Sequence, residues 1–116
     1  MSGLNEKARI LDIGCGTGYY LNLISEKGFE CLGIDHSESM LRQSRSIYPG
    51  LNVQLGDARK LSFKDDSFDA VISIETLRYF SNRDSLIREI YRVTKPGGKI
   101  FVTAAPLFSL NTYGIF

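Results

Sequence analysis

This 116-residue sequence has almost no excess charge, no long apolar run and only two cysteines. Each of these features excludes some classes of function. The 14 Lys and Arg nearly balance the 13 Asp and Glu for a net charge of +1, so the chain lacks the basic stripe of a nucleic-acid-binding protein. No apolar run approaches the ~18 residues of a membrane span, and residues 1–9 do not resemble a signal peptide. We therefore expect a cytoplasmic protein that binds neither nucleic acid nor membrane.

The cysteines are two, Cys15 and Cys31. Cys15 follows an expected strand over 9–13, and Cys31 opens an expected strand over 29–34. If these strands are parallel neighbours, the cysteines lie at opposite ends, roughly 15 Å apart at ~3.3 Å per residue. A disulfide requires Cα atoms within ~7 Å. We expect two free thiols, with Cys15 a small loop residue rather than a nucleophile.

Internal repeats and low-complexity tracts are also missing. A chain of this length suits one domain. By size scaling it buries roughly two-thirds of its unfolded surface, which is enough for one core. We expect a single domain over residues 1–116.

Glycine, in contrast, is concentrated directly after the first apolar run. Arg9–Ile13 is apolar around one acid, which is typical of a central strand in a parallel sheet. Gly14, Gly16 and Gly18 follow, and a helical pattern begins near Leu21. Glycine permits positive φ and lets a ligand lie against the backbone, and a helix start offers free N–H groups. This edge of an open α/β sheet is where ligands bind.

The spacing of these glycines separates two kinds of nucleotide ligand. Dinucleotide-binding folds use G-x-G-x-x-G, whose third glycine allows close packing near a pyrophosphate. Here the pattern is G-x-G-x-G and Tyr19 stands at the position of that third glycine, which disfavours a nicotinamide-dependent oxidoreductase. An adenosine-bearing ligand without a pyrophosphate fits better. The alternative is a plain strand-to-helix turn with incidental glycines.

Strands and helices are expected to alternate along the chain. Apolar periodicity and turn residues predict helices over 18–27, 38–47 and 84–93, and further strands over 29–34, 51–55, 68–74 and 99–104. Ser37 is the expected N-cap of the second helix, Gly28 closes the first helix, and residues 95–98 end the third. This alternation indicates an α/β fold with a parallel sheet and right-handed crossovers.

An acidic residue, Asp35, ends the second strand. In a doubly wound sheet this position faces the ribose of an adenosine ligand, and each carboxylate oxygen can accept from one hydroxyl. The alternative is a solvated Asp that starts a turn. His36 is expected at the rim near the adenosine, with a general-base role as the less favoured alternative.

Gly56-Asp57-Ala58 ends the third strand. Asp57 can accept from the exocyclic amine of adenine, and the Ala58 N–H can donate to a ring nitrogen; the alternative is an ordinary turn Asp. Met40 can pack its flexible thioether against the nucleoside, or it can belong to the core.

Five blocks of the sequence together resemble the class I S-adenosylmethionine-dependent methyltransferases. In order they are I-L-D-I-G-C-G-T-G, L-G-I-D-H-S-E-S-M-L, V-Q-L-G-D-A, F-D-A-V-I-S-I-E-T-L and V-T-K-P-G-G-K-I-F-V. The resemblance implies a Rossmann-like doubly wound parallel sheet of strand order 3-2-1-4-5. It also implies S-adenosylmethionine as cofactor, S-adenosylhomocysteine as product, and a small molecule as the methyl acceptor.

The same resemblance implies roles for individual residues. The methionine part is expected at Asp12, Gly14, Cys15 and Gly16, the ribose at Asp35 and His36, the adenine at Asp57 and Ala58, and the sulfonium end beside Ile74. The family often has a histidine pair after the leucine that matches Leu77, whereas this chain has Arg78-Tyr79. Glu75 and Tyr79 are candidates for a general base by position only, and the acceptor is not identified.

The family normally continues after the fifth strand with a helix and an antiparallel strand pair. This sequence ends ten residues past Pro106 in an apolar stretch that resembles the connector leaving that strand. We expect a sheet without the C-terminal antiparallel strands, weakened cofactor binding, little methyl transfer, and self-association through the fifth strand or the tail. The alternative to an enzyme is a non-catalytic adenosyl-ligand-binding module or an inactive fragment of a larger methyltransferase.

Overall fold

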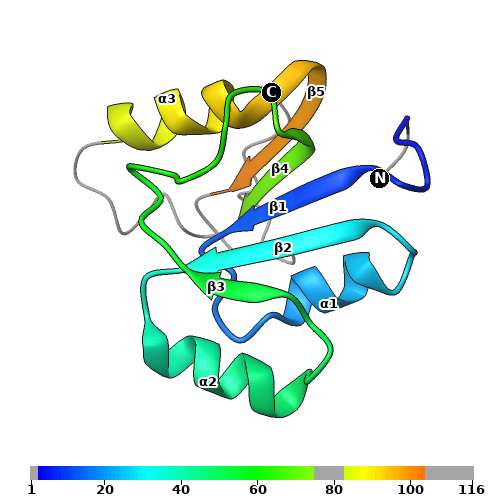
Figure 1. The fold of residues 1–116 in the computed structure, drawn as a ribbon, viewed down its shortest axis with the longest axis vertical. Helices are drawn as coiled ribbons and strands as arrows, with labels where there is room; N and C mark the ends of the chain where they lie inside the picture. Colours follow the sequence, from blue (N-terminus) through cyan, green and yellow to red (C-terminus); the bar gives the residue numbers. More distant parts are fainter. Residues whose placement is uncertain (1–2, 75–82, 104–116) are drawn as a thin grey trace.

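The computed structural model describes residues 3–74 and 83–103, which form a five-stranded parallel sheet flanked by helices (Figure 1). The elements in chain order are β1 (Arg9–Ile13), α1 (Tyr19–Ser25), β2 (Glu30–Asp35), α2 (Glu38–Ile47), β3 (Val53–Leu55), β4 (Phe68–Ile74), α3 (Asp84–Val93) and β5 (Thr94–Thr103). The strand order is β3-β2-β1-β4-β5, as predicted. β1 lies at the centre because it pairs with both β2 and β4.

The two faces of the sheet are covered by different helices. Figure 1 shows α1 and α2 on one side of the sheet and α3 on the other. Alternate residues of β1 serve the two sides, because successive side chains of a strand point to opposite faces. Leu11 and Ile13 belong to the core beneath α3, and Asp12 points toward the opposite face.

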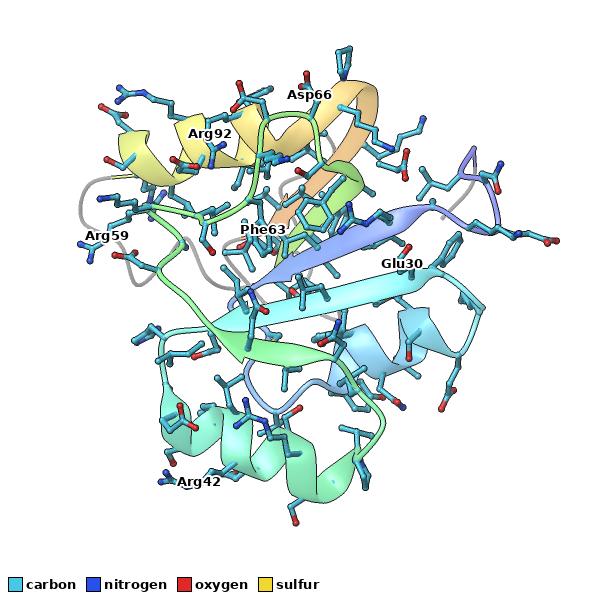
Figure 2. All side chains as sticks on the ribbon, viewed as in Figure 1. Glu30, Arg42, Arg59, Phe63, Asp66 and Arg92 are labelled. Carbon is cyan, nitrogen blue, oxygen red and sulfur yellow. The ribbon has the colours of Figure 1, made fainter. Side chains whose placement is uncertain are left out.

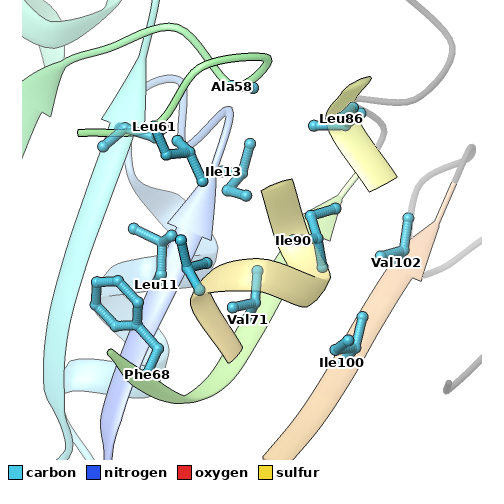
Figure 3. Packing of buried hydrophobic residues seen from close by; sticks show 12 residues of the cluster. Leu11, Ile13, Ala58, Leu61, Phe68, Val71, Leu86, Ile90, Ile100 and Val102 are labelled. Carbon is cyan, nitrogen blue, oxygen red and sulfur yellow. The ribbon is translucent and has the colours of Figure 1, made fainter. Parts of the chain in front are cut away.

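The core is correspondingly divided into two clusters of buried residues. The larger cluster lies between α3 and the sheet (Figure 3), and its members are Leu11, Ile13, Ile34, Ala58, Leu61, Phe68, Val71, Leu86, Ile90, Val93, Ile100 and Val102. The smaller cluster lies under α1 and α2 and contains Leu21, Leu41 and Val53, with Cys15, Cys31 and Leu51 partly buried against it. Both cysteines are free thiols, as predicted.

Four elements have the predicted bounds, namely β1, α2, β4 and α3. The N-cap prediction is also confirmed, because the Ser37 side chain accepts a hydrogen bond from the backbone N–H of Met40. The prediction for the fifth strand is wrong at its start. Thr94 already pairs with Phe68, and the register then jumps to Ala70 with Lys99, so residues 95–98 form an irregularity within β5 rather than a turn before it.

Three other boundaries are corrected. α1 covers residues 19–25 rather than 18–27, and its C-cap is Glu26. Gly28, with φ of +95°, therefore lies in the turn beyond the cap. β2 begins at Glu30, and β3 is limited to Val53–Leu55, because only these residues pair with β2.

None of the helices in residues 3–74 and 83–103 is long and apolar enough to cross a membrane. Residues 104–116, the tail expected to promote self-association, lie outside the described residues.

Candidate functional site

The candidate site lies where the carboxyl ends of β1, β2 and β3 meet. Ile13 is paired with Ile34, and Asp35 is paired with Leu55, so the loops that follow these strands emerge at one edge of the sheet. The backbone N–H groups of Gly14 and Cys15 both donate to the Ile34 carbonyl oxygen, at 2.8 and 2.9 Å. These bonds fold the glycine loop over the end of β2.

The three glycines of this loop are required for different reasons. All have positive φ, at 75° for Gly14, 57° for Gly16 and 90° for Gly18. A Cβ on Gly18 would lie 2.6 Å from Leu51 Cδ2 and 2.9 Å from Ser44 Oγ, so Gly18 lets the loop pack against α2. A Cβ on Gly16 would meet nothing within 4 Å. Gly16 therefore leaves bare backbone facing open space, where a ligand can approach.

Asp35 joins the glycine loop to the start of α2. It is only 8% exposed, and its Oδ2 accepts from the Gly16 N–H at 2.8 Å. Its Oδ1 accepts from the Ser37 N–H at 2.9 Å. Each oxygen of a carboxylate has room for a further donor, so Asp35 is held in place and can still accept from a ligand. The His36 side chain is 86% exposed and lies at the rim, with Nδ1 3.7 Å from Asp35 Oδ1.

Asp12 is the more unusual of the two buried acids. It is 3% exposed, and within residues 3–74 and 83–103 no group donates a hydrogen bond to its carboxylate. Burial, helped by the nearby negative charge of Asp35, raises the pKa of Asp12 to about 8. The site thus holds a buried acid with a pKa well above its usual value and, among the described residues, without a hydrogen-bond donor.

The two thiols near Asp12 both have a raised pKa. Burial first, and then the charge of Asp12, raise the pKa of Cys15 to about 12 and that of Cys31 to about 11. Since the thiolate is the nucleophilic form, the structure agrees with the expectation that Cys15 fills the loop.

Asp57, the expected acceptor for the adenine amine, is paired with a neighbouring arginine. Its carboxylate accepts from the Arg59 side chain, at 3.2 Å from Nε and 3.4 Å from Nη2, and from the Arg59 backbone N–H at 2.9 Å. These bonds hold the pKa of Asp57 below its usual value. The Asp57 side chain is 51% exposed, whereas neighbouring Ala58 is buried in the larger core cluster. Arg59 was missed in the sequence, although its spacing of two residues is a local signal.

The remaining expected residues are placed unevenly. Met40 is 42% exposed in the first turn of α2, which argues against the core-packing alternative. Ile74 is half-buried at the end of β4, where it pairs with Thr103. Glu75 and Tyr79 lie outside the described residues, together with Leu77 and Arg78.

A groove of about 590 Å³ lies elsewhere, near the C-terminal ends of α1 and α2. It is lined by Phe29, Ile47 and Asn52, among others, and none of the expected cofactor residues lines it. The strand-end loops, rather than this groove, are therefore the candidate site.

Comparison with known proteins identifies the class. Residues 11–102 match a family described as "Methyltransferase domain". The match covers more than half of the chain, and the chain belongs to this family. Its fold is that of the class I S-adenosylmethionine-dependent methyltransferases.

Individual relatives extend well beyond this chain. The chain is 40% identical over 94 residues to a demethylmenaquinone methyltransferase of Streptomyces avermitilis, covering 81% of this chain and 41% of that protein. A solved S-adenosylmethionine-dependent methyltransferase of Methanosarcina mazei superposes with a TM-score of 0.79 and 33% identity, covering 85% and 53%. The cyclase SpnF superposes with a TM-score of 0.76 and 33% sequence identity, and the match covers 85% of this chain and 39% of that protein. The chain spans roughly two-fifths to one-half of these proteins.

Proposed function

We propose that this chain carries the S-adenosylmethionine-binding part of a methyltransferase that acts on a small molecule. The observation that carries the proposal is the link that Asp35 makes between Gly16 and Ser37. This link fixes two strand-end loops next to a buried, unpaired Asp12. In such an arrangement Asp35 can accept from a hydroxyl group of a ligand, and Asp12 can accept from a neighbouring donor.

The residues present fit the cofactor. The carboxyl group of Asp12, which has no donor among the described residues, can accept from the methionine part. The exposed backbone at Gly16 lets the ligand approach closely. The Asp35 carboxylate has lone pairs left for the ribose hydroxyls. Asp57 and the Ala58 N–H are proposed for the adenine, with Met40 and His36 at the rim. When bound, S-adenosylmethionine supplies a methyl group that its sulfonium already activates.

The protein is therefore required to position two molecules and to exclude water. Holding reactants in the productive geometry can supply up to about 7–11 kcal/mol of the barrier. A general base is needed only if the acceptor must lose a proton. Glu75 and Tyr79 stay candidates for that role by their position after β4.

The acceptor is proposed to be a small molecule. The relative from Streptomyces avermitilis is named as a demethylmenaquinone methyltransferase, which is consistent with an acceptor that is not a macromolecule. Two free thiols favour the reducing cytoplasm as the compartment. We also propose self-association through β5, which forms one edge of the described sheet, or through the tail. Sedimentation would show a strictly monomeric chain if that part is wrong.

A second candidate function is binding of an adenosyl ligand without methyl transfer. One observation favours it: a protein that superposes on this chain with a TM-score of 0.76 is named as a cyclase. Incorporation of labelled methyl into candidate acceptors separates the two functions. Binding without incorporation would support the second.

The test of the shared part of both proposals is calorimetric titration with S-adenosylhomocysteine and with NAD. We expect saturable binding of S-adenosylhomocysteine and no comparable binding of NAD. Tighter binding of NAD would contradict the proposal and support the oxidoreductase that Tyr19 disfavours.

A further inference from the structure

Arg92, in the last turn of α3, forms hydrogen bonds with the segment that connects β3 to β4. Its guanidinium donates to the Phe63 carbonyl oxygen at 2.7 Å and to the Leu61 carbonyl oxygen at 3.0 Å. It also donates to Asp65 Oδ1 at 3.0 Å and to Glu89 Oε2 at 2.8 Å. Figure 2 shows Arg92 on α3 beside the connection that carries Phe63.

These bonds use the geometry that distinguishes arginine. A guanidinium presents its donors in a rigid planar fork, whereas lysine is a point charge on a flexible stem. Two of the acceptors are backbone carbonyl oxygens of an irregular connection, where each carbonyl needs a partner. Downstream, the N–H groups of Asp66 and Ser67 donate to the carbonyl oxygens of Arg92 and Val93, at 2.9 and 2.8 Å. The connection is thus attached to α3 from Leu61 to Ser67.

A short path leads from this attachment to the candidate site. The Lys60 N–H donates to the Asp57 carbonyl oxygen at 3.0 Å and closes a turn immediately before Leu61. Ala58 and Leu61 both pack in the core cluster beneath α3 (Figure 3). Few residues separate the end of β3 from the first carbonyl that Arg92 holds, so the turn has little freedom.

We infer that Arg92 is a positioning residue for the adenine end of the cofactor site. By holding the Leu61 and Phe63 carbonyls, it determines where the Asp57 carboxylate and the Ala58 N–H lie. This role rests on the proposed function, because it requires adenine to bind at that turn. Arg92 itself touches no ligand and acts through the chain it holds.

The experiment compares two ligands in four proteins. The ligands are S-adenosylhomocysteine and S-inosylhomocysteine, in which a carbonyl oxygen replaces the adenine amine. The proteins are the native chain, Arg92→Met, Arg92→Lys and the control Arg88→Met, which removes an exposed arginine from the same helix. Affinities are measured by calorimetry well below each protein's melting temperature.

We expect Arg92→Met to bind S-adenosylhomocysteine roughly tenfold more weakly, since misplacing a binding group by about 1 Å has effects of this order or larger. S-inosylhomocysteine should lose much less, so that the preference for adenosine falls toward one. Arg92→Lys should lose the same preference with a smaller fall in melting temperature, because it keeps a cation beside Glu89. Arg88→Met should keep both affinities.

The outcomes separate the possible errors. A role in stability alone would weaken both ligands equally and leave the preference unchanged in both Arg92 variants, which would overturn the positioning role only. Failure of the native chain to bind S-adenosylhomocysteine would overturn the proposed function and this role with it. In addition, the affinity loss of Arg92→Met combined with Asp57→Ala should be smaller than the sum of the two single losses, because only the Ala58 contact then remains to be misplaced. Full additivity would contradict the path through Asp57.

Discussion

The two ends of the candidate cofactor site differ in how their acidic side chains are surrounded. At the β1 and β2 loops, Asp12 and Asp35 are 3% and 8% exposed, and their surroundings are backbone and core. At the β3 loop, the Asp57 side chain is half exposed and pairs with Arg59. A buried acid without a partner destabilises the fold when it is charged, while an exposed ion pair contributes little either way.

This difference predicts which end of the site controls binding strength and which end controls selectivity. The proposed methionine and ribose end holds Asp12 without a donor among the described residues and Asp35 with room for a further donor, so a ligand that brings hydrogen-bond donors would be stabilised there. The adenine end has its charges already neutralised, and its geometry depends on the turn held by Arg92. Substitutions at the first end should therefore change stability and binding strongly, and those at the second should change mainly selectivity.

The largest effect is expected from Asp12→Asn on stability without ligand. The pKa of Asp12 is about 8 in the folded chain against 3.8 in the unfolded chain. The titration of Asp12 therefore leaves the free energy of unfolding at its highest below about pH 4, and this free energy falls as the pH rises toward 8. The Asn side chain cannot ionise, so the stability of the variant does not fall with rising pH in this way. At pH 8 its free energy of unfolding should therefore be higher than that of the native chain, by an amount on the order of a few kcal/mol.

Denaturant unfolding of Asp12→Asn at pH 4.5 and pH 8 checks this prediction. The difference between the variant and the native chain should be small at the lower pH and large at the higher. A difference independent of pH would show that Asp12 is ionised in the folded chain and has a partner.

The next effect in size is the loss of ligand binding in Asp35→Ala. The substitution removes both the proposed acceptor for the ribose and the link between Gly16 and Ser37. Hydrogen bonds to charged groups are worth about 1.5–3 kcal/mol, so affinity for S-adenosylhomocysteine should fall by roughly ten- to a hundredfold. Gln43→Ala, at an exposed position of α2 that is not among the expected cofactor residues, is the control and should change affinity little. Unchanged affinity in a folded Asp35→Ala would remove Asp35 from the ribose site.

At the other end, Asp57→Ala should have a smaller effect on affinity and almost none on stability. The ion pair with Arg59 is exposed, and such pairs contribute about 0–1 kcal/mol. Titration with S-adenosylhomocysteine and S-inosylhomocysteine should show a greater loss for the adenosine ligand. Equal losses for both would mean that Asp57 does not read the adenine amine.

The smallest effect is expected beneath the glycine loop. Ser44 is fully buried in α2, and its hydroxyl has no hydrogen-bond partner within residues 3–74 and 83–103. An unsatisfied buried hydroxyl costs about 1–3 kcal/mol, partly offset by its packing, so Ser44→Ala should raise stability by up to about 1 kcal/mol. Thermal unfolding measures this. A fall in melting temperature would show that the hydroxyl has a partner.

Local patterns were sufficient for much of the fold. The amphipathic periodicity of α3 and the Ser37 cap of α2 are encoded within a few residues, and their bounds were predicted correctly. The beginning of β5 was not predictable this way, because Thr94 becomes a strand residue only by pairing with Phe68. The relation is similar for β3, whose length depends on its register with β2.

The candidate site divides along the same line. Asp12 and Asp35 could be located because an acid within or at the end of an apolar strand is conspicuous in the sequence. That Asp12 lacks a donor, and that Asp35 holds Gly16, depends on neighbours far away in the chain. Arg92 resembles any arginine near a helix end. Its role appears only when the structure brings Leu61 and Phe63 against it, about 30 residues away along the chain.

The central claim is that the loops after β1 and β2 form an S-adenosylmethionine site organised by Asp35. Calorimetric titration of S-adenosylhomocysteine into the native chain and into Asp35→Ala, with NAD as the comparison ligand, tests it most directly. The account predicts saturable binding to the native chain, a loss of roughly ten- to a hundredfold in the variant, and no comparable binding of NAD. No binding of S-adenosylhomocysteine to the folded native chain, or equal affinity in the folded variant, would contradict it.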